Sequence, residues 1–351
     1  MTRKAKAIGL ISGGLDSTLA LALVKAQGIE VKAVTFYTGF CIAETQRRRG
    51  GRADGSMPRN EALRAAADLE ADVELVDISG PEYLEMLLHP RFGYGANANP
   101  CVDCRIFMMR KAKEIMEREG ADFVFTGEVL GQRPKSQRRD TLRIVERESK
   151  MDGRLLRPLS AKLLKHTIAE EEGLVDRARL LDVSGRGRQR QIALAGELGL
   201  TDWPQPAGGC CFLTDESFSK KFFDLLSARE AAGEGRHVTQ EEILLLTVGR
   251  HFRLSPRAKL IVGRNEVENA LLEHHVDGRA RLEAAGVMGP LGLVEGAPSP
   301  EERRLAASIL ARYGKAKDEP RAAVEWREGD RTERLEVEPA RDEAMIEGMR
   351  I

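Results

Sequence analysis

The stretch KAIGLISGGLDSTLALALVKA, residues 6–26, decides the fold that the sequence predicts. Residues 6–11 form a short apolar run, which is typical of a buried strand, and the run ends in Ser-Gly-Gly. Residues 16–26 then show helical periodicity, with Asp16 in the first turn. The stretch therefore predicts a strand, a tight glycine turn and a helix in direct succession.

The alternation of strand and helix patterns continues along the first 130 residues. Further strands are predicted at 30–37, 72–78 and 122–126, and helices at 60–70 and 102–119. This spacing favours an α/β fold with a doubly wound parallel sheet. Ligands of such sheets bind beyond the carboxyl ends of the strands. The segments SGGLDS (12–17) and TGE (126–128) both follow such ends, and we expect a site there.

The second part of the chain has a looser pattern that predicts a smaller α+β domain. The segment DWPQPAGG (202–209) is expected to be a linker, because it holds two prolines and two glycines. Two alternating runs near the C-terminus, AAVEW and RLEVE, are expected to pair as a hairpin. The predicted organisation is a first domain at 1–205, a cysteine-bearing loop and connecting helix at 206–237, a second domain at 238–325 and an acidic tail at 326–351.

Composition excludes several classes of protein. Of 351 residues, 42% are apolar and 31% charged, with 55 basic and 55 acidic side chains, so a disordered polymer or a polyanion-coating basic protein is excluded. No apolar run approaches the roughly 20 residues of a membrane span. The N-terminus does not resemble a signal peptide, and we expect a cytoplasmic protein without a membrane partner. Residues 131–165 carry eleven Lys or Arg against four Asp or Glu, which makes this stretch a candidate polyanion contact.

The glycine turn has the features of an anion-binding loop. Gly13 and Gly14 allow a tight turn that exposes backbone N–H groups at the start of a helix, and Ser12 and Ser17 add hydroxyl donors. No lysine follows the glycines as in GxxxxGK[ST], so the loop is not the usual P-loop. Asp16 would repel a phosphate unless Mg²⁺ bridged the two.

The cysteines indicate metal or sulfur chemistry. Cys101 and Cys104 form a CxxC pair at the predicted start of a helix, where thiolates are stabilised. Cys210 and Cys211 are adjacent in GGCCFLTD, after the predicted linker. Cys41 stands alone, and we interpret it as a small, half-buried residue. In a cytoplasmic protein, two pairs beside flexible glycines point to a shared chemical role.

SGGLDS resembles the SGGxDS signature of the PP-loop ATP pyrophosphatases. The resemblance implies an adenine nucleotide alpha hydrolase-like (HUP) fold, cleavage of ATP between its α and β phosphates, and adenylation of an acceptor. The motif itself does not identify the acceptor. The residues that it implies for binding ATP and Mg²⁺ are Ser12, Gly13, Gly14, Asp16, Ser17, Thr18 and Gly127.

NPCVDC and GGCCF resemble the two cysteine segments of tRNA-uridine 2-sulfurtransferases. Matched residue by residue, they make Cys104 and Cys211 catalytic, with Asp16 as the catalytic carboxylate of the ATP loop. The chain departs from that pattern, since Cys101 stands where the family has Asp and Cys210 is an additional cysteine. The chain thus resembles tRNA-uridine thiolation enzymes of the 2-sulfurtransferase or 4-thiouridine synthetase-like type. CxxC with one distant cysteine also resembles the ligand set of another PP-loop thiolation branch, which carries a 4Fe–4S cluster on three cysteines. The implied metal ligands are Cys101, Cys104 and Cys211. We rank the cluster first, a persulfide relay close second and structural zinc a distant third.

The segment VGRHFRLSPRAKLIVGRNEVEN (248–269) resembles the RNA-binding domain of NFACT-type proteins. Together with the basic segments RPKSQRR and SGRGRQRQ of the first domain, it implies a tRNA partner. The residues expected to contact RNA are Arg133, Lys135, Arg138, Arg139, Arg186, Arg188, Arg250, Arg253, Lys259 and Arg264.

The predicted function is ATP-dependent thiolation of a tRNA uridine, with sulfur from a donor protein or from sulfide. One alternative is a PP-loop ligase or amidating enzyme without sulfur transfer, but it leaves four cysteines without a role. Another is an RNA-binding module with a regulatory nucleotide site. The sequence leaves open whether C2 or C4 is thiolated, which tRNA position is used and what the oligomeric state is.

Overall fold

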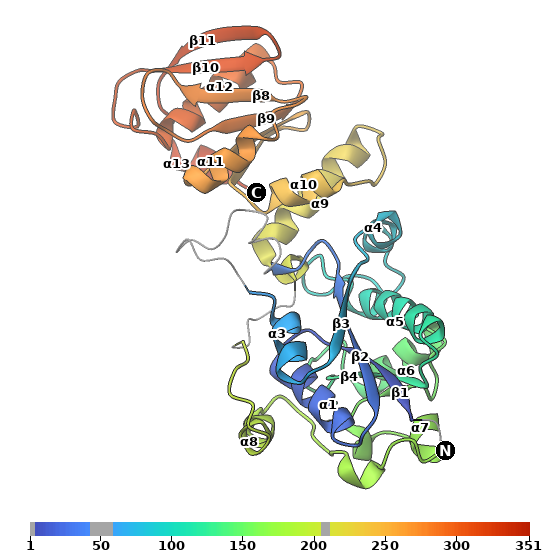
Figure 1. Ribbon diagram of the computed structural model, residues 1–351. Helices are drawn as coiled ribbons and strands as arrows, with labels where there is room; N and C mark the ends of the chain where they lie inside the picture. Colours follow the sequence, from blue (N-terminus) through green and yellow to red (C-terminus); the bar gives the residue numbers. More distant parts are fainter. Residues whose placement is uncertain (1–3, 43–58, 205–210) are drawn as a thin grey trace. The chain divides into compact units, whose positions relative to one another are not determined.

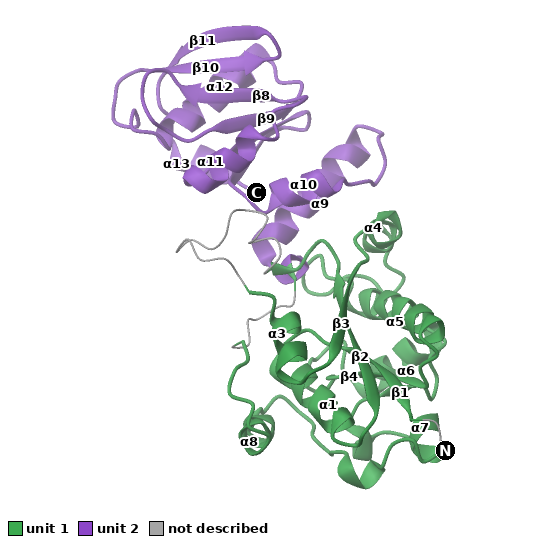
Figure 2. Ribbon diagram, in the orientation of Figure 1, with its two compact units in different colours: residues 1–43, 58–211 green, residues 44–57, 212–351 purple. Residues whose placement is uncertain are grey.

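The computed structural model describes residues 4–42, 59–204 and 211–351. These residues divide into two compact units (Figure 2). Unit 1 holds the described residues up to Cys211, and unit 2 holds residues 212–351. The finer division of the chain into four parts stays a prediction. Residue 325, the predicted end of the RNA-binding domain, lies inside strand β10 of unit 2.

The described residues of unit 1 form a five-stranded parallel sheet in the order β3-β2-β1-β4-β5. Its strands are β1 (Lys6–Leu10), β2 (Glu30–Tyr37), β3 (Asp72–Asp77), β4 (Phe123–Thr126) and β5 (Leu155–Leu156). The chain first winds from β1 outward to β3 and then returns to place β4 on the other side of β1. The winding direction therefore reverses between β1 and β4, which confirms the predicted doubly wound sheet and makes this the topological switch point.

Helices cover both faces of this sheet (Figure 1). Because parallel crossovers are right-handed, α1 and α3 lie on one face and α5, which leads back to β4, lies on the other. Leu21 and Val24 of α1 and Ala65 of α3 pack with Phe123 and Phe125 of β4 in one buried cluster. The helices are α1 (Leu15–Lys25), α3 (Glu61–Asp68), α4 (Pro81–Leu88), α5 (Cys101–Arg118), α6 (Arg139–Glu148), α7 (Ile168–Glu171) and α8 (Gln189–Glu197), with short 3-10 turns η1 (Ala161–Leu163) and η2 (Arg177–Arg179).

Some elements of unit 1 have no counterpart in the sequence interpretation. Helix α6 lies within the stretch that we interpreted only as basic. Its sequence, RDTLRIVERE, is mostly charged, and Leu142 and Val145 are the buried residues of the helix. Such a narrow apolar stripe gives a weak periodic signal, although the stripe is sufficient to dock the helix.

The described residues of unit 2 form a six-stranded antiparallel sheet in the order β11-β10-β8-β9-β7-β6. The hairpin expected from AAVEW and RLEVE is present as β10 and β11. The strands are β6 (Arg250–Ser255), β7 (Ala258–Val262), β8 (Ala280–Ala284), β9 (Gly292–Gly296), β10 (Ala322–Glu328) and β11 (Arg331–Val337), and the helices are α9 (Glu216–Ala231), α10 (Gln240–Leu246), α11 (Glu266–Glu273), α12 (Pro300–Arg312) and α13 (Glu343–Met349), preceded by the turn η3 (Phe212–Thr214).

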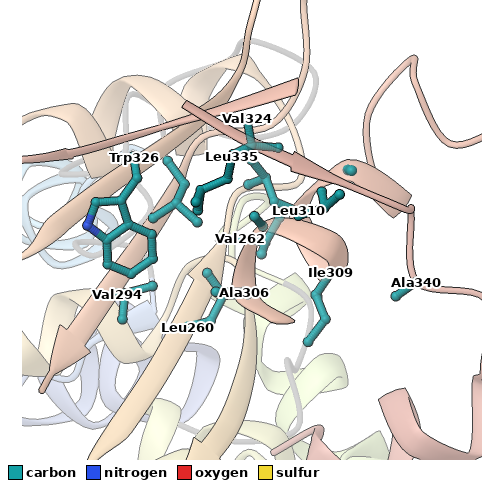
Figure 3. Close-up of a cluster of buried hydrophobic side chains, with 14 of the residues drawn as sticks. Leu260, Val262, Val294, Ala306, Ile309, Leu310, Val324, Trp326, Leu335 and Ala340 are labelled. Carbon is teal, nitrogen blue, oxygen red and sulfur yellow. The ribbon is translucent and has the colours of Figure 1, made fainter. Parts of the chain in front are cut away.

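Strand alternation gives unit 2 two apolar layers. Leu260 and Val262 of β7 belong to the cluster under α12, together with Leu310 of α12 and Trp326 of β10 (Figure 3). Ile261, between them in the sequence, belongs to a second cluster that includes Leu245 of α10 and Leu272 of α11. Both faces of the sheet are therefore covered, as the predicted α+β class requires. In the part of the chain that the structure describes, no helix has the length and apolar character needed to cross a membrane.

Candidate functional site

The glycine loop between β1 and α1 has a conformation that other residues would disrupt. Gly13 has a φ of +75°, and a Cβ at this position would lie 2.1 Å from the carbonyl carbon of Glu61. Inside the loop, the Ser17 hydroxyl donates to the Gly14 carbonyl at 2.9 Å, and the Ser12 N–H donates to Ser17 Oγ at 3.3 Å. The loop is therefore held in shape by its own hydrogen bonds. The Thr18 hydroxyl is buried and donates to the Gly14 carbonyl, so it supports the loop from within the helix.

Gly127 brings the end of β4 into direct contact with this loop. A Cβ on Gly127 would lie 2.4 Å from the Ser17 nitrogen and 2.5 Å from its Cα. These atoms are backbone and cannot rotate away. The two segments that were expected to form the site, 12–17 and 126–128, therefore meet at the β1/β4 switch point.

Asp16 has one satisfied and one unsatisfied carboxylate oxygen. Its Oδ2 accepts a hydrogen bond from Gln132 Nε2 at 3.0 Å and lies 3.6 Å from a guanidinium nitrogen of Arg188. Its Oδ1 is buried and has no hydrogen-bond partner among the described residues. Because an unpaired buried oxygen is costly, Oδ1 is suited to a cation, and a single carboxylate together with substrate phosphates is a common Mg²⁺ environment.

A third segment, SGRGRQRQ (184–191), joins the other two. Leu130 and Ser184 pair as a parallel bridge, and the Gly185 N–H donates to the Leu130 carbonyl at 2.8 Å. Basic side chains from both segments are thereby brought to the site: Arg138, Arg139 and Arg186 are exposed, Arg133 and Arg188 are half-buried, and Lys135 donates to the Tyr94 carbonyl.

Glu128, which follows Gly127, is the centre of a buried charge network that the sequence interpretation missed. The side chain is only 4% exposed. It accepts from Arg157 Nε at 3.1 Å, and Arg105 Nε lies 3.6 Å from its other oxygen. Burial raises the pKa of the Glu128 carboxyl, but the two guanidinium groups outweigh burial and hold that pKa below its ordinary value. The acidic residue in the TGE segment is the only sequence signal for this network.

The thiols of Cys104 and Cys211 both lie near the Tyr83 hydroxyl. Cys104 Sγ is 3.3 Å from Tyr83 Oη, and Tyr83 is 1% exposed. Burial raises the pKa of Tyr83 well above its ordinary value, and charge on Cys104 and Cys211 raises it further. Tyr83 therefore stays protonated and is available as a donor to a thiolate. A lone tyrosine at the third position of a helix gave no signal for this role in the sequence.

Cys101 does not join these two cysteines in a metal site. Its Sγ lies 3.0 Å from Asn99 Nδ2, which donates to it. Among the described residues, no group of three or more His, Cys, Asp or Glu side chains could hold a metal ion. The expected three-ligand set of Cys101, Cys104 and Cys211 is therefore not formed there, because Cys101 interacts with Asn99 while Cys104 contacts Tyr83. Cys210 lies outside the described residues.

The residues of unit 2 that were expected to contact RNA are engaged within the unit. Arg253 pairs with Asp224, and Arg264 pairs with Glu268. The Arg250 guanidinium lies over the Tyr313 ring, 4.5 Å from its centroid. The expectation for Lys259 needs correction: its side chain is 3% exposed and lies 2.7 Å from the Glu295 carboxylate, so it cannot reach a phosphate. Both faces of β7 are covered, because its side chains belong to the two apolar clusters on either side of the sheet.

A basic cavity of about 660 Å³ in unit 2 was not identified from the sequence. Tyr313 lines it, and Lys317 and Arg341 are its exposed basic residues. Its remaining lining residues are Arg312, Asp318 and Ala340. The residues come from α12 and from the segments that follow α12 and β11, so no single sequence motif marks the cavity.

Residues 2–171 match the model of the family described as Thiamine biosynthesis protein (ThiI). Residues 249–348 match that of the NFACT protein RNA binding domain. Both resemblances expected from the sequence are thereby confirmed. The ThiI match includes the Asp16 loop, Gly127 and Cys104, and the NFACT match extends over the hairpin β10–β11 that we had assigned to an acidic tail.

Curated relatives carry related names. A tRNA-specific 2-thiouridylase MnmA of Syntrophotalea carbinolica is 34% identical over 121 residues, 33% of this chain and 32% of the relative. A probable tRNA sulfurtransferase of Thermococcus kodakarensis is 29% identical over 154 residues, 44% and 36% of the two chains. A solved 4-thiouridine synthetase–RNA complex with bound ATP aligns with a TM-score of 0.36 and 21% identity, over 56% of this chain and 41% of that one. This chain spans about a third of the length of the curated relatives it matches.

The contact between Gly127 and the Asp16 loop predicts a strong effect of a single methyl group. We expect Gly127→Ala to lower the stability of unit 1 by about 1–3 kcal/mol, because the new Cβ meets backbone rather than a side chain that can move. Gly187→Ala is the matched control, since a Cβ at that position meets nothing within 4 Å. Thermal unfolding of both variants measures the difference, and equal midpoints would contradict the proposed packing.

Proposed function

We propose that this protein uses ATP to thiolate a uridine in tRNA. The observation that carries the proposal is a continuous run of contacts between the anion-binding loop and a thiol. Gly127 packs on Ser17, and the neighbouring Glu128 pairs with Arg105, which directly follows Cys104. An adenylation site and a sulfur carrier at one edge of the same sheet are what this reaction needs.

The first step activates the uridine. The carbonyl oxygen of uridine is a poor leaving group, so direct replacement by sulfur is slow. In the proposed reaction this oxygen attacks the α-phosphorus of ATP, and pyrophosphate leaves. The N–H groups at the start of α1 and the hydroxyls of Ser12 and Ser17 hold the phosphates, since a helix N-terminus favours negative charge. Asp16 would hold Mg²⁺, and the ion would neutralise the negative charge that develops on the leaving pyrophosphate.

The second step delivers sulfur. We propose that Cys104 and Cys211 carry the sulfur as a persulfide. The terminal sulfur attacks the activated carbon, and AMP leaves with the former carbonyl oxygen. Tyr83 supports this step, because its protonated hydroxyl is placed to donate to the Cys104 sulfur and so to stabilise it as a thiolate. The donor of the sulfur is a persulfide-bearing protein: the Cys104 thiolate attacks the terminal sulfur of the donor persulfide, and the donor leaves as a thiolate.

A 4Fe–4S cluster is the second candidate for the sulfur carrier. It rests on the CxxC pair of Cys101 and Cys104 with Cys211 as third ligand. The described residues do not fit it as they stand, because they provide no three-ligand group. The persulfide relay therefore becomes the favoured mechanism, and no step is assigned to the cluster. A ligase without sulfur transfer is less favoured still, because it gives Cys104 and Cys211 no role beside Tyr83.

RNA is proposed to bind at both units. In unit 1 the exposed Arg138, Arg139 and Arg186 are the proposed contacts, on the segments that follow Gly127 and precede α8. In unit 2 the basic cavity beside Tyr313 combines cationic groups with an aromatic ring, which suits contacts to phosphates and bases. This assignment moves the expected RNA contacts of unit 2 from Lys259 to the cavity.

The function is tested by incubating the protein with ATP, Mg²⁺, a sulfur donor and unmodified tRNA. Pyrophosphate release that depends on tRNA, together with thiouridine in the digested nucleosides, supports the proposal. Mass spectrometry and the ultraviolet spectrum of the nucleoside distinguish C2 from C4 thiolation. Pyrophosphate release without any thiouridine would favour the ligase, and tRNA binding without pyrophosphate release would favour the RNA-binding module.

Asp16→Asn is expected to reduce tRNA-dependent pyrophosphate release by about 100-fold or more, since loss of a metal contact to the leaving group costs several kcal/mol. The substitution keeps the size of the side chain, so the contact with Gln132 persists. Asp152→Asn serves as the control, because Asp152 is exposed and lies outside the loop. Near-equal rates for the two variants would remove Asp16 from the mechanism.

The cysteines separate the two sulfur mechanisms. We expect Cys104→Ser and Cys211→Ser each to lose thiouridine formation while tRNA-dependent pyrophosphate release continues, because adenylation precedes sulfur transfer. Cys101→Ser decides between carriers: the relay retains thiolation in this variant, and the cluster loses it. Iron and sulfide analysis after anaerobic purification gives an independent reading. Stoichiometric iron in the wild type and its loss in Cys101→Ser would favour the cluster.

The cavity of unit 2 predicts which charges affect RNA binding. We expect the double variant Lys317→Ala/Arg341→Ala to bind tRNA more weakly, with a salt dependence shallower by up to about 0.9 per lost phosphate contact. Arg331→Ala/Arg334→Ala on strand β11 removes the same charge from exposed positions outside the cavity. Filter-binding titrations at several salt concentrations compare the two. Equal slopes for both double variants would exclude the cavity as an RNA site.

A further inference from the structure

Cys41 lies directly opposite Cys211. The two residues pair as an antiparallel bridge, and neither forms a disulfide in this structure. Opposite residues of an antiparallel pair have Cα atoms about 4.5–5.5 Å apart. Disulfides span Cα distances of about 4.4–6.8 Å. The backbone of this pair therefore already has a separation at which a disulfide forms without main-chain movement.

The segment that carries Cys41 is fixed by its own turn. Strand β2 ends at Tyr37, and Gly39 has a φ of +84°, which turns the chain immediately after the strand. Thr38 Oγ1 accepts from the Phe40 N–H at 3.4 Å and lies 3.8 Å from Cys41 Sγ. The turn at Gly39 and the interactions of Thr38 thus hold Cys41 at the carboxyl edge of the sheet.

Phe40 connects this turn to the other cysteines. It is 1% exposed, and its ring packs against that of Tyr83 with centroids 6.0 Å apart. Tyr83 is the residue whose hydroxyl contacts Cys104 and is affected by charge on Cys211. Tyr83 thus interacts with Cys104 and Cys211, and Phe40 links its ring to the turn that carries Cys41.

We propose that Cys41 is the resolving thiol of Cys211, a further catalytic residue. The proposal rests on the function proposed above, in which Cys104 and Cys211 relay a persulfide. The Cys211 thiolate first attacks the terminal sulfur of the Cys104 persulfide, the bond between that sulfur and Cys104 Sγ breaks, and Cys104 leaves as a thiolate. When the terminal sulfur of Cys211 has displaced AMP from the uridine, the product is still joined to Cys211 through a disulfide bond.

Cys41 then releases the product. Its thiolate attacks Cys211 Sγ, the bond between Cys211 Sγ and the thiouridine sulfur breaks, and the thiouridine leaves as an anion that takes up a proton. The two thiols are oxidised to a Cys41–Cys211 disulfide, and the transferred sulfur is reduced by the same two electrons. A dithiol reductant returns the pair to thiols before the next turnover. Without RNA, the same attack on a Cys211 persulfide releases hydrosulfide.

Geometry favours Cys41 over Cys104 as the attacking thiol. Cys104 lies in the first turn of α5, where its Sγ contacts Tyr83 Oη and donates to Met108 Sδ at 3.8 Å. A disulfide with Cys104 requires these contacts to break. Cys41 is half-buried and faces Cys211 across the bridge, so side-chain rotation is sufficient.

The test loads the full-length protein with inorganic polysulfide in the absence of ATP and tRNA. Unreacted thiols are alkylated, and tryptic peptides are analysed by mass spectrometry while hydrosulfide is measured in solution. We expect the peptide of Cys41 to be linked to that of Cys211, with about one hydrosulfide released per chain. The same experiment on Cys210→Ser removes the ambiguity of the adjacent cysteine in that peptide.

Cys41→Ser is the decisive variant, and Cys101→Ser is its matched control. In Cys41→Ser we expect a persulfide to accumulate on Cys211 and hydrosulfide release to slow by at least about tenfold. Cys101→Ser is expected to form the Cys41–Cys211 link as the wild type does. Far-ultraviolet circular dichroism checks that both variants are folded. The Cys41–Cys211 link is measured in the wild type itself, so that result does not depend on the folding of either variant.

Three results would overturn the inference. The first is a persulfide on Cys211 with Cys41 fully alkylated in the wild type, and the second is a Cys104–Cys211 link in its place. Both leave the proposed thiolation intact. The third is the absence of any persulfide on Cys104 and Cys211 in the Cys41→Ser variant, which would remove the sulfur relay of the proposed function as well.

Discussion

The contact between Gly127 and the backbone of Ser17 is the constraint on which the candidate site depends. It joins the end of β4 to the start of α1 at the point where the sheet reverses its winding direction. Any side chain at position 127 would separate the two segments. Because they touch, the loop that follows Gly127 can place Gln132 on Asp16. The same loop pairs with the segment around Ser184 and so gathers the basic residues of two distant stretches.

The buried carboxylate of Glu128 extends this constraint toward the cysteines. A buried charge requires partners, and Arg157 and Arg105 provide them. Arg105 belongs to the first turns of α5, so the ion pair sets the position of the helix start that carries Cys104. The glycine loop and the helix start with Cys104 are therefore connected by packing and charge within a single unit. In the proposed reaction, this connection places both steps at one sheet edge.

Tyr83 organises the sulfur side of the site. Burial keeps its hydroxyl protonated, and Phe40 and Phe107 pack against its ring. Cys104 and Cys211 interact with it, and Cys41 lies opposite Cys211. A cluster would use the CxxC pair as one unit, but Cys101 interacts with Asn99 instead. The arrangement favours chemistry in which thiols exchange sulfur in pairs, because such chemistry needs neighbours and does not need a common metal.

The sequence by itself determined the parallel sheet, the glycine loop with Asp16, the hairpin β10–β11 and the two family resemblances. These features depend on residues close together in the chain, where periodicity and turn chemistry are sufficient. Only the tertiary structure decided that Cys41 faces Cys211, that Asp16 has an unpaired oxygen and that Lys259 is buried. It also placed Glu128 among its arginines and formed the cavity beside Tyr313. Each of these features depends on which distant segments pack together. Whether a side chain is buried, and which partner it pairs with, is set by those contacts and cannot be read from the neighbouring sequence.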